Sequence, residues 1–394
     1  MSGVLDGIRV LDFGRYIAGP FCATLLGDLG AEVIRIEKVN GSEDRFISPV
    51  SETGEGGIFL QLARNKLGMT LNPLKPEGRE IVKKLVATAD VVVANLPDET
   101  LEQMGLDYNS LKTIKDDIIL ATASAFGSKG PYRQKVGFDG VAQAMSGAMH
   151  MSGYPDEPMK HYVPYVDFET ATLCAFATLA ALMERAKSGR GQQVQGSLLG
   201  SALTVANGTL IEQAELEIDR VSSGNLGQIA APADVYPTKD GWILVQALGQ
   251  PLFKRWAELM GEDHWLDDPR FATDQSRGDN GKVISERMAA WAADHTTDEA
   301  LAILEDARIP AGPVLSPRQT LTHPQVTAGG YLEEVDFPGL PRPAPLTGTP
   351  VRLSETPGTI RSRAPTLGEH TDQIMTELGY GPDEIEDLRA KRVV

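Results

Sequence analysis

The 394-residue chain is poor in cysteine, histidine and basic side chains, and each shortage argues against a class of protein. The two cysteines, Cys22 and Cys174, fall in apolar helical patterns, which predicts buried thiols and no disulfide framework. The six histidines are scattered without the spacing of metal ligands, so no metal site is expected. Because 54 acidic residues outnumber 37 basic ones, the net charge of −17 argues against a nucleic-acid partner.

The sequence also contains neither the pattern of a secretory leader nor a convincing membrane span. The N-terminus has no charged stretch followed by an apolar one, so no secretory leader is predicted. The apolar run at residues 170–183 is too short and too rich in alanine to be a convincing membrane span. We therefore expect a cytoplasmic protein without membrane contact. Its length and its 42% hydrophobic residues allow a core large enough for two domains.

Short apolar runs alternate with helical patterns over the N-terminal half, which predicts a doubly wound parallel sheet of the α/β class. The expected strands lie at residues 8–12, 32–37, 91–97 and 116–127. The proline-rich stretch at 335–358 is expected to be irregular. The predicted domains are a large domain beginning with residues 1–224, a smaller α+β domain at 225–315, and a linker with a C-terminal segment at 316–394 that returns to the large domain.

A doubly wound sheet raises the possibility of a dinucleotide-binding enzyme, and the first loop argues against it. Residues 14–19, GRYIAG, follow the first expected strand without the GxGxxG spacing that brings a pyrophosphate onto a helix N-terminus. Glu37, at the end of the second strand, resembles a ribose-binding acid, but the glycine loop that such an acid needs is missing. A nicotinamide-dependent dehydrogenase is therefore not expected.

One acidic residue, Asp167, stands at the start of a long apolar helix expected over residues 168–187. Apolar side chains lie nearly all round this helix, which predicts that it is buried. Position alone leaves two interpretations of Asp167 open. Its carboxylate is either the N-cap of the helix, or a nucleophile that the helix N-terminus keeps ionised for attack on an activated acyl group.

Resemblance to a known family favours the second interpretation. Residues 164–194, PYVDFETATLCAFATLAALMERAKSGRGQQV, resemble the catalytic aspartate region of the family III CoA-transferases, the CaiB/BaiF family, which includes formyl-CoA transferase and carnitine CoA-transferase. Other segments resemble the family in the family's order, at residues 5–46, 65–97, 101–132, 309–326 and 364–394. The resemblance implies a Rossmann-like large domain, a small domain between its two parts, and an interlocked, ring-shaped homodimer.

The implied activity is transfer of CoA from an acyl-CoA donor to a small carboxylic acid. Asp167 would carry first an acyl group, as an anhydride, and then CoA, as a thioester. Coenzyme A and acyl-CoA are substrates in this scheme, and no tightly bound cofactor is expected. Asp139 is a second candidate, as a group that orients Asp167 or the thioester, with an N-cap of its own helix as the alternative. Gly224, Gly227 and Gly249 are candidates for the mobile loop that the family uses to exclude water.

The candidate CoA-binding residues lie at strand ends and in loops. By the resemblance, five positions match CoA contacts of the family: Tyr16, Ile17, Lys38, Asn95 and Leu96. Arg15, Arg64 and Lys66 add cations for phosphate groups, and Lys135 resembles another CoA-binding lysine with a spacing one residue longer. Gln103 stands where the formyl-CoA transferase branch has an arginine, so Arg64 or Lys66 is expected to compensate.

Two alternatives remain. An α-methylacyl-CoA racemase of the same fold needs a histidine to move an α-proton, and Phe138 occupies that position here. A non-catalytic acyl-CoA binding protein would bind CoA esters without exchanging label between thioester and free acid.

Overall fold

The computed structural model describes residues 3–394, and the chain forms two compact units. The first unit takes in the chain up to Gly147, together with His161–Ile211 and Ala328–Val394. The second consists of Ala148–Lys160 and Glu212–Thr327. This second unit is wider than the small domain expected at 225–315, since it also includes the hairpin of β6 (Gly153–Tyr154) and β7 (Glu157–Pro158).

The first unit is built on a six-stranded parallel sheet in the order β3-β2-β1-β4-β5-β8. The strand order reverses between β1 and β4, which is where ligand-binding crevices form in doubly wound sheets. The strands are β1 (Arg9–Asp12), β2 (Glu32–Glu37), β3 (Lys66–Thr70), β4 (Val91–Ala94), β5 (Ile119–Ser124) and β8 (Gln193–Ser197). Most central strand residues are buried, because helices cover both faces.

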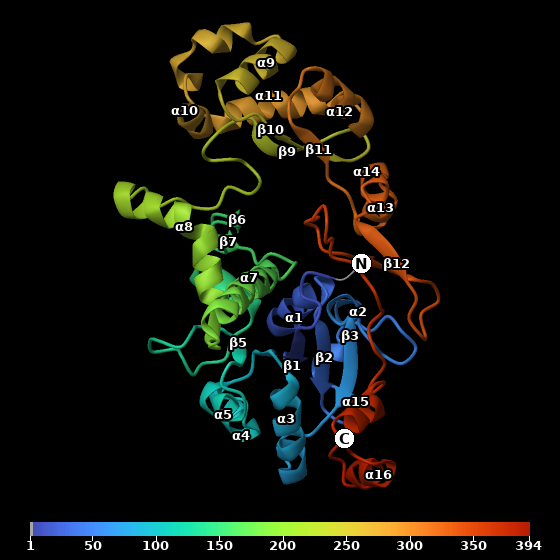
Figure 1. Ribbon diagram of the computed structural model, residues 1–394. Helices are drawn as coiled ribbons and strands as arrows, with labels where there is room; N and C mark the ends of the chain where they lie inside the picture. The colour runs from blue at the N-terminus through green and yellow to red at the C-terminus, as the bar shows by residue number, and fades with distance from the viewer. Residues whose placement is uncertain (1–2) are drawn as a thin grey trace. The chain divides into compact units, whose positions relative to one another are not determined.

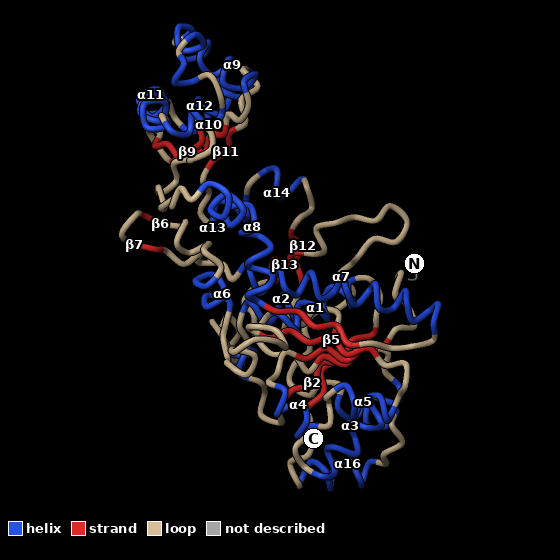
Figure 2. The backbone as a smooth tube through the Cα atoms, turned by 90° about the vertical axis from the view of Figure 1, so that its left-hand side faces the viewer, coloured by secondary structure: helices blue, strands red, loops and turns tan. Residues whose placement is uncertain are grey.

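Figure 2 shows the sheet with α1 and α7 on one face and α3, α5 and α16 on the other. The first face packs on α1 (Ala18–Asp28), α7 (Tyr165–Ser188) and the start of α8 (Leu198–Leu216). The second packs on α3 (Pro76–Thr88), α4 (Asp98–Met104), α5 (Tyr108–Ile114), α15 (Thr371–Glu377) and α16 (Pro382–Ala390). Shorter elements of this unit are η1 (Glu43–Phe46), α2 (Gly57–Leu62), α6 (Asp139–Met145), β12 (Leu332–Val335) and β13 (Ala344–Thr347).

Strand β3 was not among the expected strands. Its amide groups bond to residues some 300 positions later, where His370 Nδ1 accepts from Gly68 N at 3.0 Å and Thr371 Oγ1 accepts from Thr70 N at 3.1 Å. The C-terminal segment therefore covers the edge of the sheet, which would otherwise be open to pairing. The stretch expected to be irregular also contains order, because β12 and β13 form an antiparallel pair.

Helix α7 is only half buried, contrary to the expectation from its composition. It packs against α1, β5 and β8, while Phe176 and Met183 on the other side are 70% and 65% exposed. Among residues 3–394, α7 alone is long and apolar enough to cross a membrane. The core helix of a globular domain passes the same test.

The second unit has its own core, around Trp256, Phe253 and Tyr236. Figure 1 labels its antiparallel sheet, β9 (Ala233–Pro237), β10 (Trp242–Gln246) and β11 (Ala311–Pro313), in the order β11-β10-β9. Its helices are α9 (Gln250–Met260), η2 (Asp263–Asp267), η3 (Pro269–Phe271), α10 (Asp274–Asp279), α11 (Gly281–Ala293), α12 (Thr297–Asp306) and α13 (Pro317–Thr322). Helix α14 (Pro324–Ala328) follows at the return to the first unit.

Candidate active site

The N-terminus of α7 is capped from another helix. Pro164 precedes α7 and has no side-chain group that can accept its first N–H groups. Asp139 Oδ2, from the first residue of α6, accepts instead from Val166 N at 2.8 Å and from Asp167 N at 3.2 Å. A single carboxylate oxygen thus takes over the role of an N-cap for α7.

This arrangement corrects both capping interpretations from the sequence. Asp167 is not the N-cap, because it lies inside the first turn of α7. Within residues 3–394 its carboxylate has no hydrogen-bond or ion-pair partner, while its own amide is held by Asp139. Asp139 is not the cap of its own helix either, since Phe138 holds that position without a side-chain hydrogen bond.

The surroundings of Asp167 favour the protonated acid. Burial raises the pKa of the Asp167 carboxyl from 3.8 to about 7, and the negative charge of Asp139 adds to the rise. Burial and the like charge of Asp139 therefore oppose the ionising effect expected of the helix N-terminus. A carboxyl whose pKa lies near neutrality, in a partly buried place, has the properties of a reactive group.

A buried amide completes the cluster. Gln143 lies one turn after Asp139 on α6, and its Nε2 donates to Asp139 Oδ1. Its Oε1 accepts from the backbone N–H of His161 at 3.0 Å. Gln143 was not among the residues predicted from the sequence, although its spacing of four residues from Asp139 on an expected helix was the available signal.

The loop after β1 is held rigidly by its neighbours. Asn95, after β4, accepts from Arg15 N at 2.6 Å and donates back to Arg15 O at 2.8 Å. The Arg15 guanidinium donates to the carbonyls of Phe13, Gly14 and Ile36, and burial lowers the pKa of Arg15. Both side chains that were candidates for CoA are thus engaged by backbone in this structure. Ile17, at the N-cap position of α1, is buried, and Leu96 packs against the core of the first unit on the face of the sheet that α3, α4 and α5 cover.

Tyr16 connects this loop to the acidic cluster. Its backbone is left-handed, with φ of 61°, a conformation that is uncommon and costly for an aromatic residue. Its ring meets that of Phe138 edge to face, with centroids 5.3 Å apart. Phe138 directly precedes Asp139, so the loop after β1 and the residues that cap α7 form one connected surface.

Two of the predicted CoA-binding cations are exposed. Lys38, after β2, is 58% exposed in its side chain and pairs with Glu43. Lys135 lies over the ring of Tyr132, with its Nζ 3.6 Å from the ring centroid. Either lysine can turn to a phosphate group at little cost, because exposed ion pairs and cation–π contacts are weak.

Besides Arg15, two more of the predicted cations, Arg64 and Lys66, are buried and paired, which corrects their assignment. Arg64 donates to both oxygens of Asp28, at 3.1 and 2.6 Å. Lys66 is not in a loop but starts β3, and it donates to Asp12 Oδ2 at 2.8 Å and to Pro20 O at 2.7 Å. Neither side chain is free to bind a phosphate group or to compensate for Gln103, which lies exposed on α4.

The three candidate glycines for a covering loop belong to the second unit, and each has its amide engaged. Gly224 N donates to Gly153 O at 2.7 Å and Gly227 N to Ala233 O at 2.6 Å. Gly249 has a φ of 84° and donates to both carboxylate oxygens of Asp274, at 2.9 and 3.1 Å. None of these three amides is available to an oxyanion in this structure.

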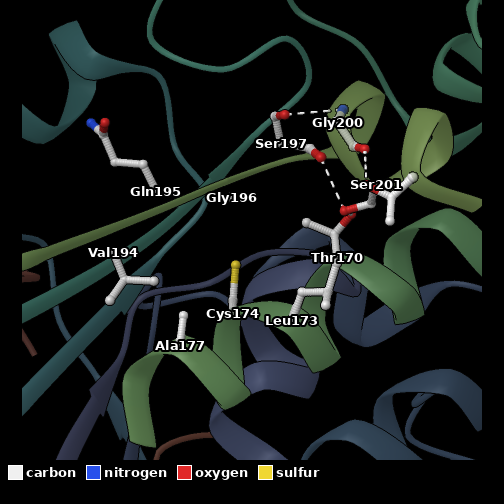
Figure 3. A pocket seen from close by; sticks show the side chains of 11 residues that line it. Thr170, Leu173, Cys174, Ala177, Val194, Gln195, Gly196, Ser197, Gly200 and Ser201 are labelled. Carbon is white, nitrogen blue, oxygen red and sulfur yellow. Dashed lines mark hydrogen bonds between the residues drawn. The ribbon is translucent and has the colours of Figure 1, made fainter. Parts of the chain in front are cut away.

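A cavity of about 350 Å³ opens between α7, β8 and α8 (Figure 3). It begins at Thr170, three positions after Asp167, which places both residues on one face of α7. The hydroxyl of Thr170 lies 2.8 Å from Val166 O and 2.8 Å from Ser201 Oγ, so this hydroxyl is satisfied within the protein. Cys174, which also lines it, has a pKa raised to about 11 by burial, so its thiol is not reactive near neutral pH.

Within residues 3–394, no group of three or more histidine, cysteine, aspartate or glutamate side chains is arranged to hold a metal ion. The candidate site therefore consists of two carboxylates of different surroundings, a bridging amide and an adjoining aromatic surface.

Comparison with known proteins places this site in context. The family model described as CoA-transferase family III matches residues 5–371. Succinyl-CoA–D-citramalate CoA-transferase of Chloroflexus aurantiacus is 35% identical over 99% of this chain and 98% of its own length. Succinyl-CoA:glutarate CoA-transferase of Mus musculus is 32% identical over 99% of this chain and 90% of its own. A crystal structure of a CaiB/BaiF family protein from Brucella suis, 31% identical, has a TM-score of 0.85 and covers 96% of this chain and 100% of its own.

Proposed function

The chain belongs to CoA-transferase family III and is an enzyme of CoA transfer, and from this premise we propose that Asp167 is its covalent nucleophile. The observation that carries the proposal is the state of this carboxylate. It lies in the first turn of a capped helix, partly buried, and within residues 3–394 it has no partner. A carboxylate that neither caps a helix nor forms an ion pair is left available for chemistry.

The proposed reaction has four steps, in which the activated acyl group is always held as a thioester or an anhydride and no such bond is lost to water. Asp167 attacks the donor acyl-CoA, which forms an acyl–aspartyl anhydride and releases the CoA thiolate. The thiolate attacks the aspartyl carbonyl, which forms an aspartyl-CoA thioester and releases the donor acid. The acceptor carboxylate attacks this thioester, which forms an acceptor–aspartyl anhydride and releases the thiolate again. The thiolate then attacks the acceptor acyl carbon, which yields the product acyl-CoA and restores Asp167.

Each step passes through an oxyanion that needs N–H donors. The N–H groups of Val166 and Asp167 are occupied by Asp139, and those of Gly224, Gly227 and Gly249 are occupied as well. A shift of one of the glycine segments would free an amide. In the proposed reaction such a segment also covers the site and keeps water away from the anhydride.

We propose that the substrates are dicarboxylic acids and their CoA thioesters. Relatives that span nearly the whole chain are named for succinyl-CoA as donor and for citramalate, glutarate, malate or mesaconate as acceptor. These acids share two carboxylates on a short carbon chain. For the CoA moiety, the exposed Lys38 and Lys135 are the proposed phosphate contacts, and Tyr16 and Ile17 the proposed contacts of the loop after β1.

We further propose a cytoplasmic homodimer. Support comes from the apolar side chains that α7 and α8 leave exposed, among them Phe176, Met183, Val205 and Ile211. A second copy of the chain would cover such a surface. Light scattering coupled to gel filtration tests this part, and a monomer at micromolar concentration would contradict it.

The test of the nucleophile uses Asp167→Asn, with Asp98→Asn as the matched control on the exposed first turn of α4. We expect Asp167→Asn to lose transfer between succinyl-CoA and a panel of dicarboxylates by about 10³-fold or more, with binding of the thioester largely intact. Hydroxylamine trapping followed by peptide mass analysis should modify Asp167 in the native enzyme alone. Retained turnover in Asp167→Asn would remove this residue from the mechanism.

The alternatives predict different results in the same assay. A racemase would introduce deuterium at the α-carbon of the substrate without any acceptor acid, and Phe138 offers no proton acceptor for that reaction. A non-catalytic binding protein would bind succinyl-CoA and exchange no label between succinate and its thioester.

A further inference from the structure

Gln143 connects three separate segments at the start of α7. Its Nε2 donates to Asp139 Oδ1 on α6, and its Oε1 accepts from His161 N, at the point where the chain returns from the second unit. Asp139 Oδ2 in turn accepts from the first N–H groups of α7. Gln143 is 2% exposed and Asp139 6% exposed, so no bulk water replaces these bonds.

The chemistry of the partners leaves the amide one orientation. A backbone N–H faces its oxygen, and a carboxylate oxygen faces its nitrogen. The flipped amide would set N–H against N–H and oxygen against oxygen, which costs both hydrogen bonds in a buried place. Gln143 therefore holds the Asp139 carboxylate with one oxygen on the amide and the other turned to α7.

Loss of this bridge would act on Asp167 through Asp139. Without its donor, Asp139 Oδ1 becomes a buried acceptor without a partner, so the carboxyl either rotates or takes up a proton. Either change weakens the bond from Asp167 N and lets the first turn of α7 move. Because the attacking oxygen must lie within about 3–3.5 Å of the thioester carbon, a small shift has a large effect on the rate.

We propose that Gln143 is a positioning residue for CoA transfer, which acts on Asp167 through Asp139. The inference rests on the proposed role of Asp167 as nucleophile. The titratable groups around the bridge are Asp139, Asp167, Tyr165 and His161. The imidazole of His161 contacts Val163 O and packs edge to face on Tyr165.

Two variants separate positioning from a general loss of structure. Gln143→Met keeps the length of the side chain and removes both hydrogen bonds. Gln143→Glu keeps the acceptor for His161 N and loses the donor to Asp139 unless the new carboxyl is protonated. At low pH the protonated form can restore the bridge, since its O–H donates to Asp139 while its carbonyl accepts from His161 N. Gln373→Glu, on the exposed face of α15, is the matched control for the added charge.

We expect Gln143→Met to lower kcat by about 30- to 100-fold and to leave the KM for succinyl-CoA within about 2-fold. Gln143→Glu should show a pH profile in which kcat, relative to the native enzyme, rises as the pH falls. Gln373→Glu should follow the native profile. Circular dichroism and thermal unfolding verify that each variant is folded. If Gln143→Met does not fold, the pH profile of Gln143→Glu still tests the positioning role.

A native kcat and pH profile in Gln143→Met, or a relative kcat in Gln143→Glu that does not change with pH, would overturn the inference. These outcomes differ from failure of the proposed function. If Asp167→Asn keeps its activity, the nucleophile is wrong. If Asp167→Asn loses transfer while both Gln143 variants behave like the native enzyme, only the positioning role is wrong.

Discussion

Two groups of carboxylates in the first unit differ in what faces them. In the first group, at the end of β1 and the end of α1, Asp12 faces Lys66 and Arg35, Asp28 faces Arg64, and each carboxylate has a cation. At the start of α7, Asp139 faces N–H groups and an amide, and Asp167 faces no donor within residues 3–394.

The presence or absence of a cationic partner distinguishes a carboxylate with a structural role from one that is available for chemistry. A buried carboxylate with a full set of partners is held ionised, as the pKa of Asp12 shows, because Lys66 and Arg35 lower it in spite of burial. A carboxylate that is partly buried and lies near a like charge has a raised pKa, and its charge is costly in the folded state. The first kind stabilises a loop, whereas the second is retained at a cost in stability and points to function.

In the first group, the largest loss of stability is expected when the ammonium group of Lys66 is removed. Lys66→Met leaves Asp12 with only Arg35, at 3.4 Å, and the amide of Gly14, so we expect a loss of about 3–5 kcal/mol in the free energy of unfolding. Urea denaturation measures it. The double variant Asp12→Asn with Lys66→Met should recover part of the loss, because no charge then remains unpaired. A loss below about 1 kcal/mol in the single variant would contradict the pairing.

In the second group, the raised pKa of Asp167 should determine how the rate of CoA transfer depends on pH. If Asp167 is the nucleophile, as proposed, attack requires its ionised form. Its pKa is about 7, so the rate should rise with pH up to that value and level off above it. At about pH 5 we expect about 100-fold slower transfer than at high pH, as measured in single turnovers with succinyl-CoA. Asp139→Asn removes the like charge and should move the midpoint to lower pH. A midpoint near 4 in the native enzyme would show that Asp167 is better solvated than the structure indicates.

The same pKa predicts that removal of the Asp167 carboxylate stabilises the folded protein. The folded protein binds the Asp167 proton more tightly than the unfolded chain, whose pKa is near 3.8, so this group destabilises the fold as pH rises from 3.8 to 7. Above that range Asp167→Asn should be more stable than the native enzyme by about 1–2 kcal/mol, less than the full shift implies because Asp167 is partly solvated. The difference should vanish near pH 4, and equal stability at pH 8 would contradict it.

The sequence was a good guide where the signal was local. Strands β1, β2, β4 and β5 were expected because each is a short apolar run between turn signals. Asp167 stood out because it is an isolated acid at the start of a long apolar helix. Strand β3 was missed because Lys66 and Gly68 interrupt its apolar pattern, and that lysine is buried only through a partner 54 positions away.

The environment of each charge did not follow from the sequence. Arg64 and Lys66 read as free phosphate ligands because Asp28 and Asp12 become their neighbours only in the folded sheet. The cap of α7 lies on α6, 28 positions from Asp167. The raised pKa of Asp167 comes first from burial in the folded chain and then from the charge of that distant Asp139. Pairing across the fold decides whether a charged residue is structural or reactive, and such pairs leave no local pattern.

The smallest change in stability is expected on substitution of Lys38. This lysine has a partner of opposite charge, like the carboxylates of the first group, but it is exposed. Its pair with Glu43 is exposed on both sides, so Lys38→Ala should change the free energy of unfolding by less than about 0.5 kcal/mol. If Lys38 contacts a phosphate group of CoA, the KM for succinyl-CoA should rise several-fold, and the rise should shrink at high salt because the charges are screened. Glu43→Gln should lower KM, since it releases the lysine. Lys83→Ala on α3, whose partner is Glu80 at similar exposure, is the matched control, and an equal KM in both lysine variants would place the phosphate groups elsewhere.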